Sequence, residues 1–148
     1  RVHIYIQKPL RYELGAFTVR NSTHYGIAGY YALMAAREGM MGFTVTDARP
    51  SIAPTFGVEP MLGTNPIAFA APSDGPHPFC FDAATSIIQR GKVEVAARAE
   101  KPLPEGVVID GAGNPLTDPD RILVDLDKGA AALLPLGGAG EEFAGYKG

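Results

Sequence analysis

Three histidines are the best candidates for proton transfer in this sequence, because imidazole titrates at about pH 6.5. His24 follows three residues that commonly cap helices, Asn21–Thr23, and it precedes two nearby glycines. Reduction of a ketone needs a hydride at carbon and a proton at oxygen, so a histidine at such a turn could supply the proton. The alternative is that the ring only helps to cap the following helix. His3 and His77 lie in contexts that favour exposed, structural roles.

A carboxylate and two glycine-containing segments are further candidates. Asp82 ends an apolar run, where it could orient a ribose hydroxyl or the substrate, or could instead cap the helix that follows. The segments Gly63–Pro66 and Leu136–Gly140 could approach a pyrophosphate closely, although each is also typical of a turn. The sequence contains no G-x-G-x-x-G motif, so a standard Rossmann dinucleotide site is not predicted.

Composition excludes several classes of protein. The formal net charge of −3, without a basic stripe, argues against nucleic-acid binding. No apolar run approaches the roughly 20 residues that cross a bilayer, so we expect a soluble protein without a membrane partner. Cys80 is the one cysteine, which excludes an internal disulfide and cysteine-rich zinc sites and fits the reducing cytoplasm. Its apolar neighbours predict a small buried side chain rather than a nucleophile. The abrupt ends suggest a piece of a longer polypeptide.

The elements around His24 should form a βαβ unit. We expect a strand over residues 15–20, a helix over 25–38 that Gly39 ends in the left-handed conformation, and a strand over 41–46. The two strands should then be parallel, and ligands of such sheets bind beyond the carboxyl ends of the strands. The turn at Asn21–His24 would lie at one such end.

The remaining elements are predicted from apolar runs and turn residues. Residues 67–71 and 78–82 read as strands of a hairpin around Ser73–Gly75. Thr85 or Ser86 could cap a helix that runs to about residue 100. Residues 101–120 are rich in proline and glycine and read as loop, with a short strand at 107–109 and a small apolar segment at 130–136.

Taken together, these residues resemble one family. The motif Asn21-Ser22-Thr23-His24-Tyr25-Gly26 and four later segments resemble, in order, the malate/L-lactate dehydrogenase family, which also holds ureidoglycolate and sulfolactate dehydrogenases and cyclic-imine reductases. The matching blocks are Val19–Ala32, Leu62–Ala68, Phe81–Ser86, Leu134–Gly138 and Gly145–Gly148. The resemblance implies a non-Rossmann α/β fold with a mixed β-sheet surrounded by helices. It also implies NAD or NADP as cofactor, a homodimer and a small 2-oxo acid or 2-hydroxy acid as substrate.

The resemblance assigns roles to individual residues. His24 is the implied proton donor and acceptor at the substrate carbonyl, and Asn21 and Asn65 are expected to bind the substrate. The implied cofactor contacts are Ala48, Asp82, Ala83, Ala84 and Lys147, and no metal is expected. Residues 15–148 would then be the cofactor-binding and catalytic part, preceded by an unassigned segment 1–14. The alternative is a catalytically incompetent nucleotide-binding domain of the same fold.

Overall fold

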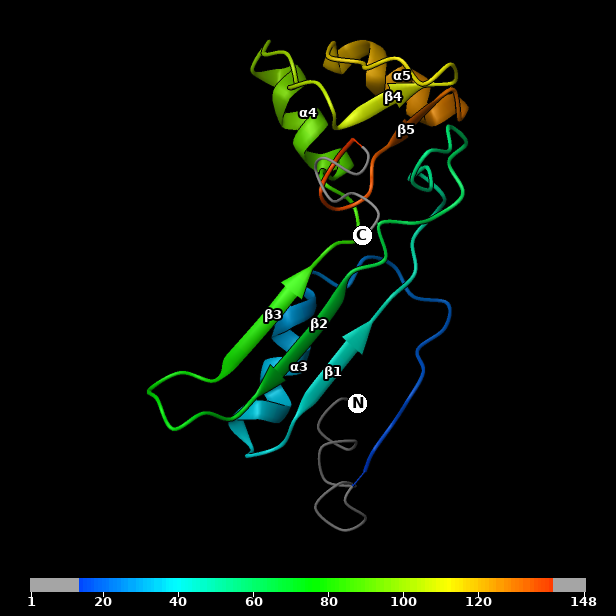
Figure 1. Cartoon of the computed structure of the whole chain (residues 1–148). Helices are drawn as coiled ribbons and strands as arrows, with labels where there is room; N and C mark the ends of the chain where they lie inside the picture. Colours follow the sequence, from blue (N-terminus) through cyan, green and yellow to red (C-terminus); the bar gives the residue numbers. More distant parts are fainter. Residues whose placement is uncertain (1–13, 140–148) are drawn as a thin grey trace. The chain divides into compact units, whose positions relative to one another are not determined.

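The computed structural model describes residues 14–139, which form two compact α/β units. The first unit contains the chain up to Val45 together with Ile67–Ala83, and the second contains Thr46–Pro66 together with the chain from Ala84. Figure 1 labels the helices and strands of each. The first unit holds α3 (Ala28–Arg37), β1 (Gly42–Val45), β2 (Ile67–Ala71) and β3 (Phe79–Ala83). The second holds α4 (Arg90–Arg98), β4 (Val108–Asp110), α5 (Pro119–Lys128) and β5 (Ala131–Leu133).

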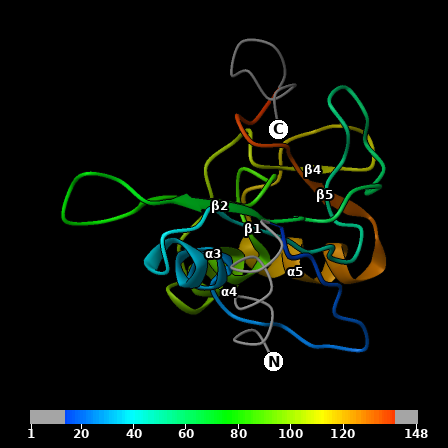
Figure 2. The same cartoon turned by 90° about the horizontal axis from the view of Figure 1, so that it is seen from below.

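The first unit is an antiparallel sheet with a helix on one face. The strand order is β1-β2-β3, and Phe43, Phe69 and Phe81 lie opposite one another across the three strands. Figure 2 shows α3 on one side of β1 and β2. The contact is made of small side chains: Ala28, Ala32, Ala36, Ala68 and Ala70. A Cβ added at Gly42 would overlap the carbonyl oxygen of Ala32, so the helix approaches the sheet closely.

The predicted hairpin is confirmed, because β2 and β3 pair antiparallel across the loop that contains Ser73–Gly75. The prediction of a buried Cys80 is wrong, since the thiol is exposed. Among the described strands, β3 pairs only with β2 and so lies at an edge of the sheet, whereas the buried alanines of the sheet under α3 come from β2. An edge position leaves the apolar run around Cys80 largely uncovered within this unit.

The predicted βαβ unit is wrong. Residues 15–20 form no strand, and β1 pairs antiparallel with β2 rather than parallel with an earlier strand. The helix begins at Ala28 instead of Tyr25, because Gly26 has a positive φ of 88° and Ile27 is extended. Asn21–Thr23 therefore lie outside the helix and do not cap it. The predicted end is correct, since Gly39 follows the C-cap with a φ of 76°.

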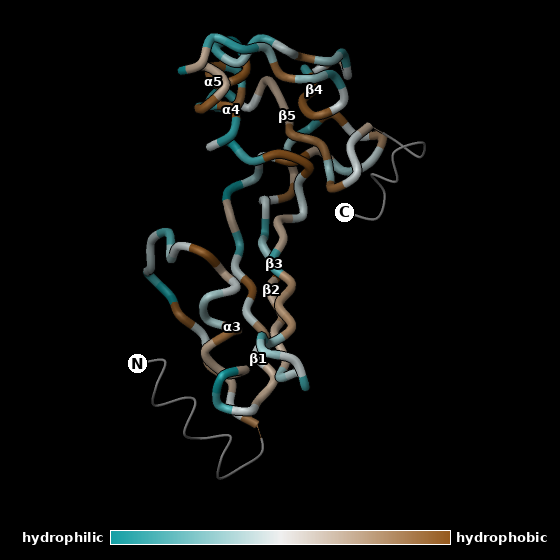
Figure 3. Tube along the Cα trace, turned by 90° about the vertical axis from the view of Figure 1, so that its left-hand side faces the viewer, coloured by the Kyte–Doolittle hydropathy of each residue, from teal (hydrophilic) through white to brown (hydrophobic). Residues whose placement is uncertain are grey.

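The second unit buries the larger apolar side chains. Its strands β4 and β5 pair antiparallel, and α4 and α5 contribute to the same core. Fully buried members of that core are Ile52, Val93, Val108, Ile122 and Leu133. Figure 3 colours the chain at β5 in the hydrophobic brown, in agreement with a strand buried at every position. The strand predicted around 107–109 is confirmed as β4, and the small apolar segment at 130–136 contains β5, which was not predicted as a strand.

Both helices of this unit differ from prediction. α4 starts at Arg90, so neither Thr85 nor Ser86 caps it. The Thr85 N–H instead donates to the Thr64 carbonyl oxygen, and Ser86 forms an isolated antiparallel β-bridge with Pro135. Helix α5 was not predicted, because its first residues fall in a stretch rich in proline and glycine.

No helix among residues 14–139 has the length and apolar character needed to span a membrane.

Candidate functional site

His24 lies in an exposed turn that precedes α3. The Gly26 N–H donates a hydrogen bond to Nδ1 of the imidazole at 3.0 Å. A nitrogen that accepts a hydrogen bond carries no proton, so Nε2 holds the proton of the neutral ring. Within the described chain, Nε2 forms no hydrogen bond with another residue. The geometry therefore fixes one tautomer and leaves an exposed imidazole next to a helix start.

A tyrosine pair holds the backbone beside His24. The Tyr31 hydroxyl donates to the carbonyl oxygen of Tyr25 at 2.8 Å, and the two rings stack with centroids 5.0 Å apart. Tyr31 lies on α3, so the helix is tied directly to the residue that follows His24. The predicted helix over residues 25–38 includes Tyr31, but helical spacing gives no signal for this hydrogen bond.

Asp82 caps a helix from a distant strand. Its Oδ2 accepts the Gly29 N–H at 2.6 Å, and Gly29 is the second residue of α3. Ile27, at the N-cap position, offers no side-chain acceptor of its own. The alternative prediction that Asp82 caps a helix is thus correct, but the predicted helix was the wrong one. Asp82 was expected to cap the helix that follows it, whereas its partner lies 53 residues earlier in the chain.

A second set of candidate residues meets in the second unit. The amide oxygen of Asn65 accepts the Ala48 N–H at 2.9 Å, which ties the residues after β1 to the residues before β2. Gly63 makes this approach possible, since a Cβ there would overlap both the Ala48 carbonyl oxygen and Asn65 Oδ1. Ala48 is exposed, and the Asn65 NH2 group donates to no other described residue.

The segment after Ala84 joins this cluster. The backbone N–H and the hydroxyl of Thr85 both donate to the Thr64 carbonyl oxygen, at 2.9 and 3.2 Å. The Thr85 carbonyl oxygen accepts the Leu136 N–H, which brings the glycine-containing turn after β5 alongside. The buried Ser86 hydroxyl has no hydrogen-bond partner among residues 14–139. Four separated segments of the sequence, at Ala48, Gly63–Asn65, Thr85 and Leu136, are therefore joined by hydrogen bonds or close approach.

The predicted site residues fall into both units. His24, Asn21, Asp82 and Ala83 belong to the first unit, and Ala48, Asn65 and Ala84 belong to the second. Asn21 is exposed and has a positive φ of 54°, a backbone conformation that asparagine tolerates better than most residues. Lys147 lies outside the described residues.

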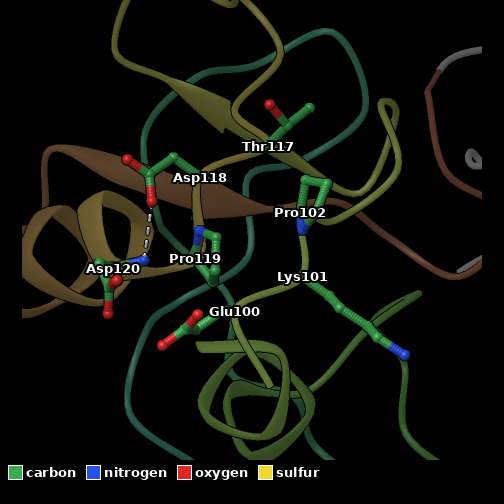
Figure 4. A pocket seen from close by; sticks show the side chains of 7 residues that line it. All are labelled: Glu100, Lys101, Pro102, Thr117, Asp118, Pro119 and Asp120. Carbon is green, nitrogen blue, oxygen red and sulfur yellow. Dashed lines mark hydrogen bonds between the residues drawn. The ribbon is translucent and has the colours of Figure 1, made fainter. Parts of the chain in front are cut away.

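A surface pocket of about 350 Å³ lies at the start of α5 and holds none of these residues. Figure 4 shows its mainly acidic and proline lining, with the Asp120 N–H donating to Asp118. Asp118 is the N-cap of α5, so its carboxylate already has partners within the helix. Among the described residues, no group of three or more His, Cys, Asp or Glu side chains is placed to hold a metal ion.

The chain is similar to a family of dehydrogenases. The family model described as malate/L-lactate dehydrogenase matches residues 2–148. The malate dehydrogenase of Pyrococcus abyssi is 50% identical over 143 residues, which cover 97% of this chain. The (2R)-3-sulfolactate dehydrogenase (NADP(+)) of Chromohalobacter salexigens is 41% identical over 88% of this chain.

The structure agrees with a solved member of the same group. The crystal structure of malate dehydrogenase from Entamoeba histolytica superposes with a TM-score of 0.90 at 46% identity, and the match covers 99% of this chain and 40% of that one. The chain also spans 38% of the length of each of the two curated relatives.

Proposed function

Because this chain belongs to the malate/L-lactate dehydrogenase family, we propose that residues 15–148 form the cofactor-binding and catalytic part of an NAD(P)-dependent oxidoreductase that interconverts small 2-oxo acids and 2-hydroxy acids. The observation that carries the proposal is the exposed His24 in the family motif, held by a defined turn. Malate is the substrate favoured by the 50% identity to a malate dehydrogenase. A homodimer in the cytoplasm is proposed from the resemblance alone.

His24 acts as the proton donor when the carbonyl is reduced. A ring that donates a proton must first carry protons on both nitrogens, and the hydrogen bond from Gly26 is then broken because Nδ1 is occupied. We assign the transferred proton to Nδ1, since its departure lets Nδ1 accept the Gly26 N–H again. In the oxidation direction, Nδ1 leaves Gly26 and takes the proton of the alcohol. The Gly26 amide thus stabilises the ring in the state that follows proton donation.

A nicotinamide cofactor, when bound, supplies or accepts the hydride. Ala48, the proposed cofactor contact that follows β1, is exposed and therefore open to approach by such a group. Ala84 and the preceding Asp82 and Ala83 complete the proposed cofactor contacts. Lys147 is proposed as a further contact, because an ammonium group suits a phosphate. Asn21 and Asn65 are proposed to orient the substrate by hydrogen bonds from their amides.

The test is a titration of the full chain with NADH and NADPH, followed by fluorescence, in the presence of oxaloacetate, pyruvate and a cyclic imino acid in turn. We expect binding of at least one cofactor and its oxidation with a 2-oxo acid. Binding without oxidation by any of these acids would instead support a nucleotide-binding domain without catalysis. If neither NADH nor NADPH binds, both the dehydrogenase and the nucleotide-binding domain without catalysis are contradicted.

A further inference from the structure

Helix α3 depends on another element for its first turn. The first four N–H groups of a helix have no partner within the helix, and a side chain at the N-cap usually serves one of them. Ile27 occupies that position and cannot do so, and the first turn contains no acidic residue. Asp82 of β3 supplies the acceptor instead, through Oδ2 at 2.6 Å from the Gly29 nitrogen. A charged acceptor at a helix start also interacts favourably with the helix dipole.

The space around this hydrogen bond is closely filled. A Cβ added at Gly29 would lie 3.0 Å from Asp82 Oδ2 and 3.1 Å from the Cys80 sulfur. The start of α3 is therefore held against β3 at one residue, with little room to shift.

The same helix start is linked to the His24 turn by two further contacts. The Tyr31 hydroxyl, one turn along α3, holds the carbonyl oxygen of Tyr25. The Gly26 N–H then holds the His24 ring. These short-range contacts run without interruption from the helix start to the imidazole, so a movement at Gly29 is transmitted to His24.

We propose that Asp82 is a positioning residue that fixes the start of α3 on the sheet and thereby sets the orientation of the His24 imidazole. The proposal rests on the function proposed for His24. It assigns to Asp82 a task beyond cofactor contact, performed through Oδ2. The second oxygen, Oδ1, forms no hydrogen bond within residues 14–139. Removal of the carboxylate should loosen the turn even when no cofactor is present.

The decisive variants are Asp82→Ala, which removes the acceptor, and Asp82→Asn, whose amide oxygen can still accept the Gly29 N–H. Asp74→Ala is the matched control, because Asp74 is exposed in the loop between β2 and β3 and forms no hydrogen bond with the described residues. All three are made in the full chain. Amide hydrogen exchange at Gly26 and Gly29 and the 15N resonances of the His24 ring are measured without cofactor or substrate.

In Asp82→Ala we expect exchange at Gly29 to be about ten to a hundred times faster, as loss of a charged hydrogen bond predicts, with a change in the His24 resonances. Asp82→Asn should restore most of the protection, and Asp74→Ala should match the parent protein. Unchanged His24 resonances in Asp82→Ala would overturn the proposal. This readout does not require turnover, so it is distinct from a failure of the proposed function.

Activity gives the second readout. We expect Asp82→Ala to lower kcat by about tenfold or more, at a temperature where the variant is folded, with partial rescue in Asp82→Asn. A loss confined to NADH affinity, with kcat unchanged, would assign Asp82 to the cofactor alone and overturn a positioning role.

Discussion

Replacement of Gly63 by alanine tests the geometry that brings Ala48 and Asn65 together. The added Cβ would overlap the Ala48 carbonyl oxygen and Asn65 Oδ1, and one of these is main chain that cannot turn away as a side chain can. The two segments must therefore separate, which breaks the hydrogen bond from the Ala48 N–H to Asn65.

The change that Gly63→Ala makes in the free energy of unfolding follows from two destabilising effects and one stabilising effect. Overpacking a closely packed position costs about 1–3 kcal/mol, and the lost hydrogen bond adds about 0.5–1.5 kcal/mol. Alanine restricts the unfolded chain more than glycine does, which returns about 0.4–1 kcal/mol. We therefore expect a net loss of about 0.5–4 kcal/mol in the free energy of unfolding, against the roughly 5–15 kcal/mol typical of a folded protein.

Urea denaturation of the full chain measures this loss of stability. The slope of the free energy of unfolding against urea concentration should be the same in the variant and in the parent protein. Gly75→Ala is the control, because the nearest neighbour of its added Cβ is Ser73 Oγ at an ordinary 3.6 Å. That variant should stay within about 0.5 kcal/mol of the parent protein. If Gly63→Ala is no less stable than Gly75→Ala, the close approach of these two segments is refuted.

Two further predictions concern the second unit. Gly91→Ala should raise the free energy of unfolding by about 0.5–1 kcal/mol in urea denaturation, because Gly91 lies in α4 with no atom near an added Cβ; a loss of stability would contradict this. Asp110 accepts hydrogen bonds from the Asn114 backbone and side chain and from the Ala112 N–H, which lower its pKa below the usual 3.8. The ionised Asp110 carboxylate therefore stabilises the fold fully above about pH 3.8, the ordinary pKa of the group. This stabilisation is lost as the pH falls through the lowered pKa of the folded state. The stability advantage of the parent protein over Asp110→Asn should shrink below about pH 3.8 in thermal melts, and a constant difference would contradict the assignment.

Local pattern predicted the helix around Met34 and the hairpin of β2 and β3, because each depends on spacing and turn residues that lie close together in sequence. It failed at residues 15–20, where apolar and β-branched residues suggested a strand that finds no partner among the described strands. The start of α3 was also misplaced, since the left-handed Gly26 was read as part of the helix. The parallel βαβ unit was inferred from the strand predicted at 15–20, so that inference was wrong as well.

Helix α5 shows a signal that was present and not used. Asp118 as N-cap, Pro119 at the first helical position and Gly129 after the last are a standard set of helix boundaries. These boundary residues were not used, because the proline- and glycine-rich composition of residues 101–120 predicted a loop.

The candidate site was predicted unevenly for a physical reason. His24 could be singled out as a candidate from its motif, and the candidates Ala48, Asn65 and Ala84 lie in the second unit. The bond from Asp82 to Gly29 joins residues 53 positions apart, and no local pattern encodes such a contact. Its prediction required the register of β3 on β2 and the place of α3 on the sheet.

The central claim is that His24 transfers the proton at the substrate carbonyl, and His24→Asn tests it most directly. The amide oxygen of asparagine can replace Nδ1 as acceptor of the Gly26 N–H, so the turn is retained while proton transfer is abolished. Single-turnover oxidation of NADH by the full chain with oxaloacetate should slow by about 10²–10⁴, with the Kd for NADH unchanged. A rate near that of the parent protein would contradict the account, as would a loss found only in the Kd for NADH.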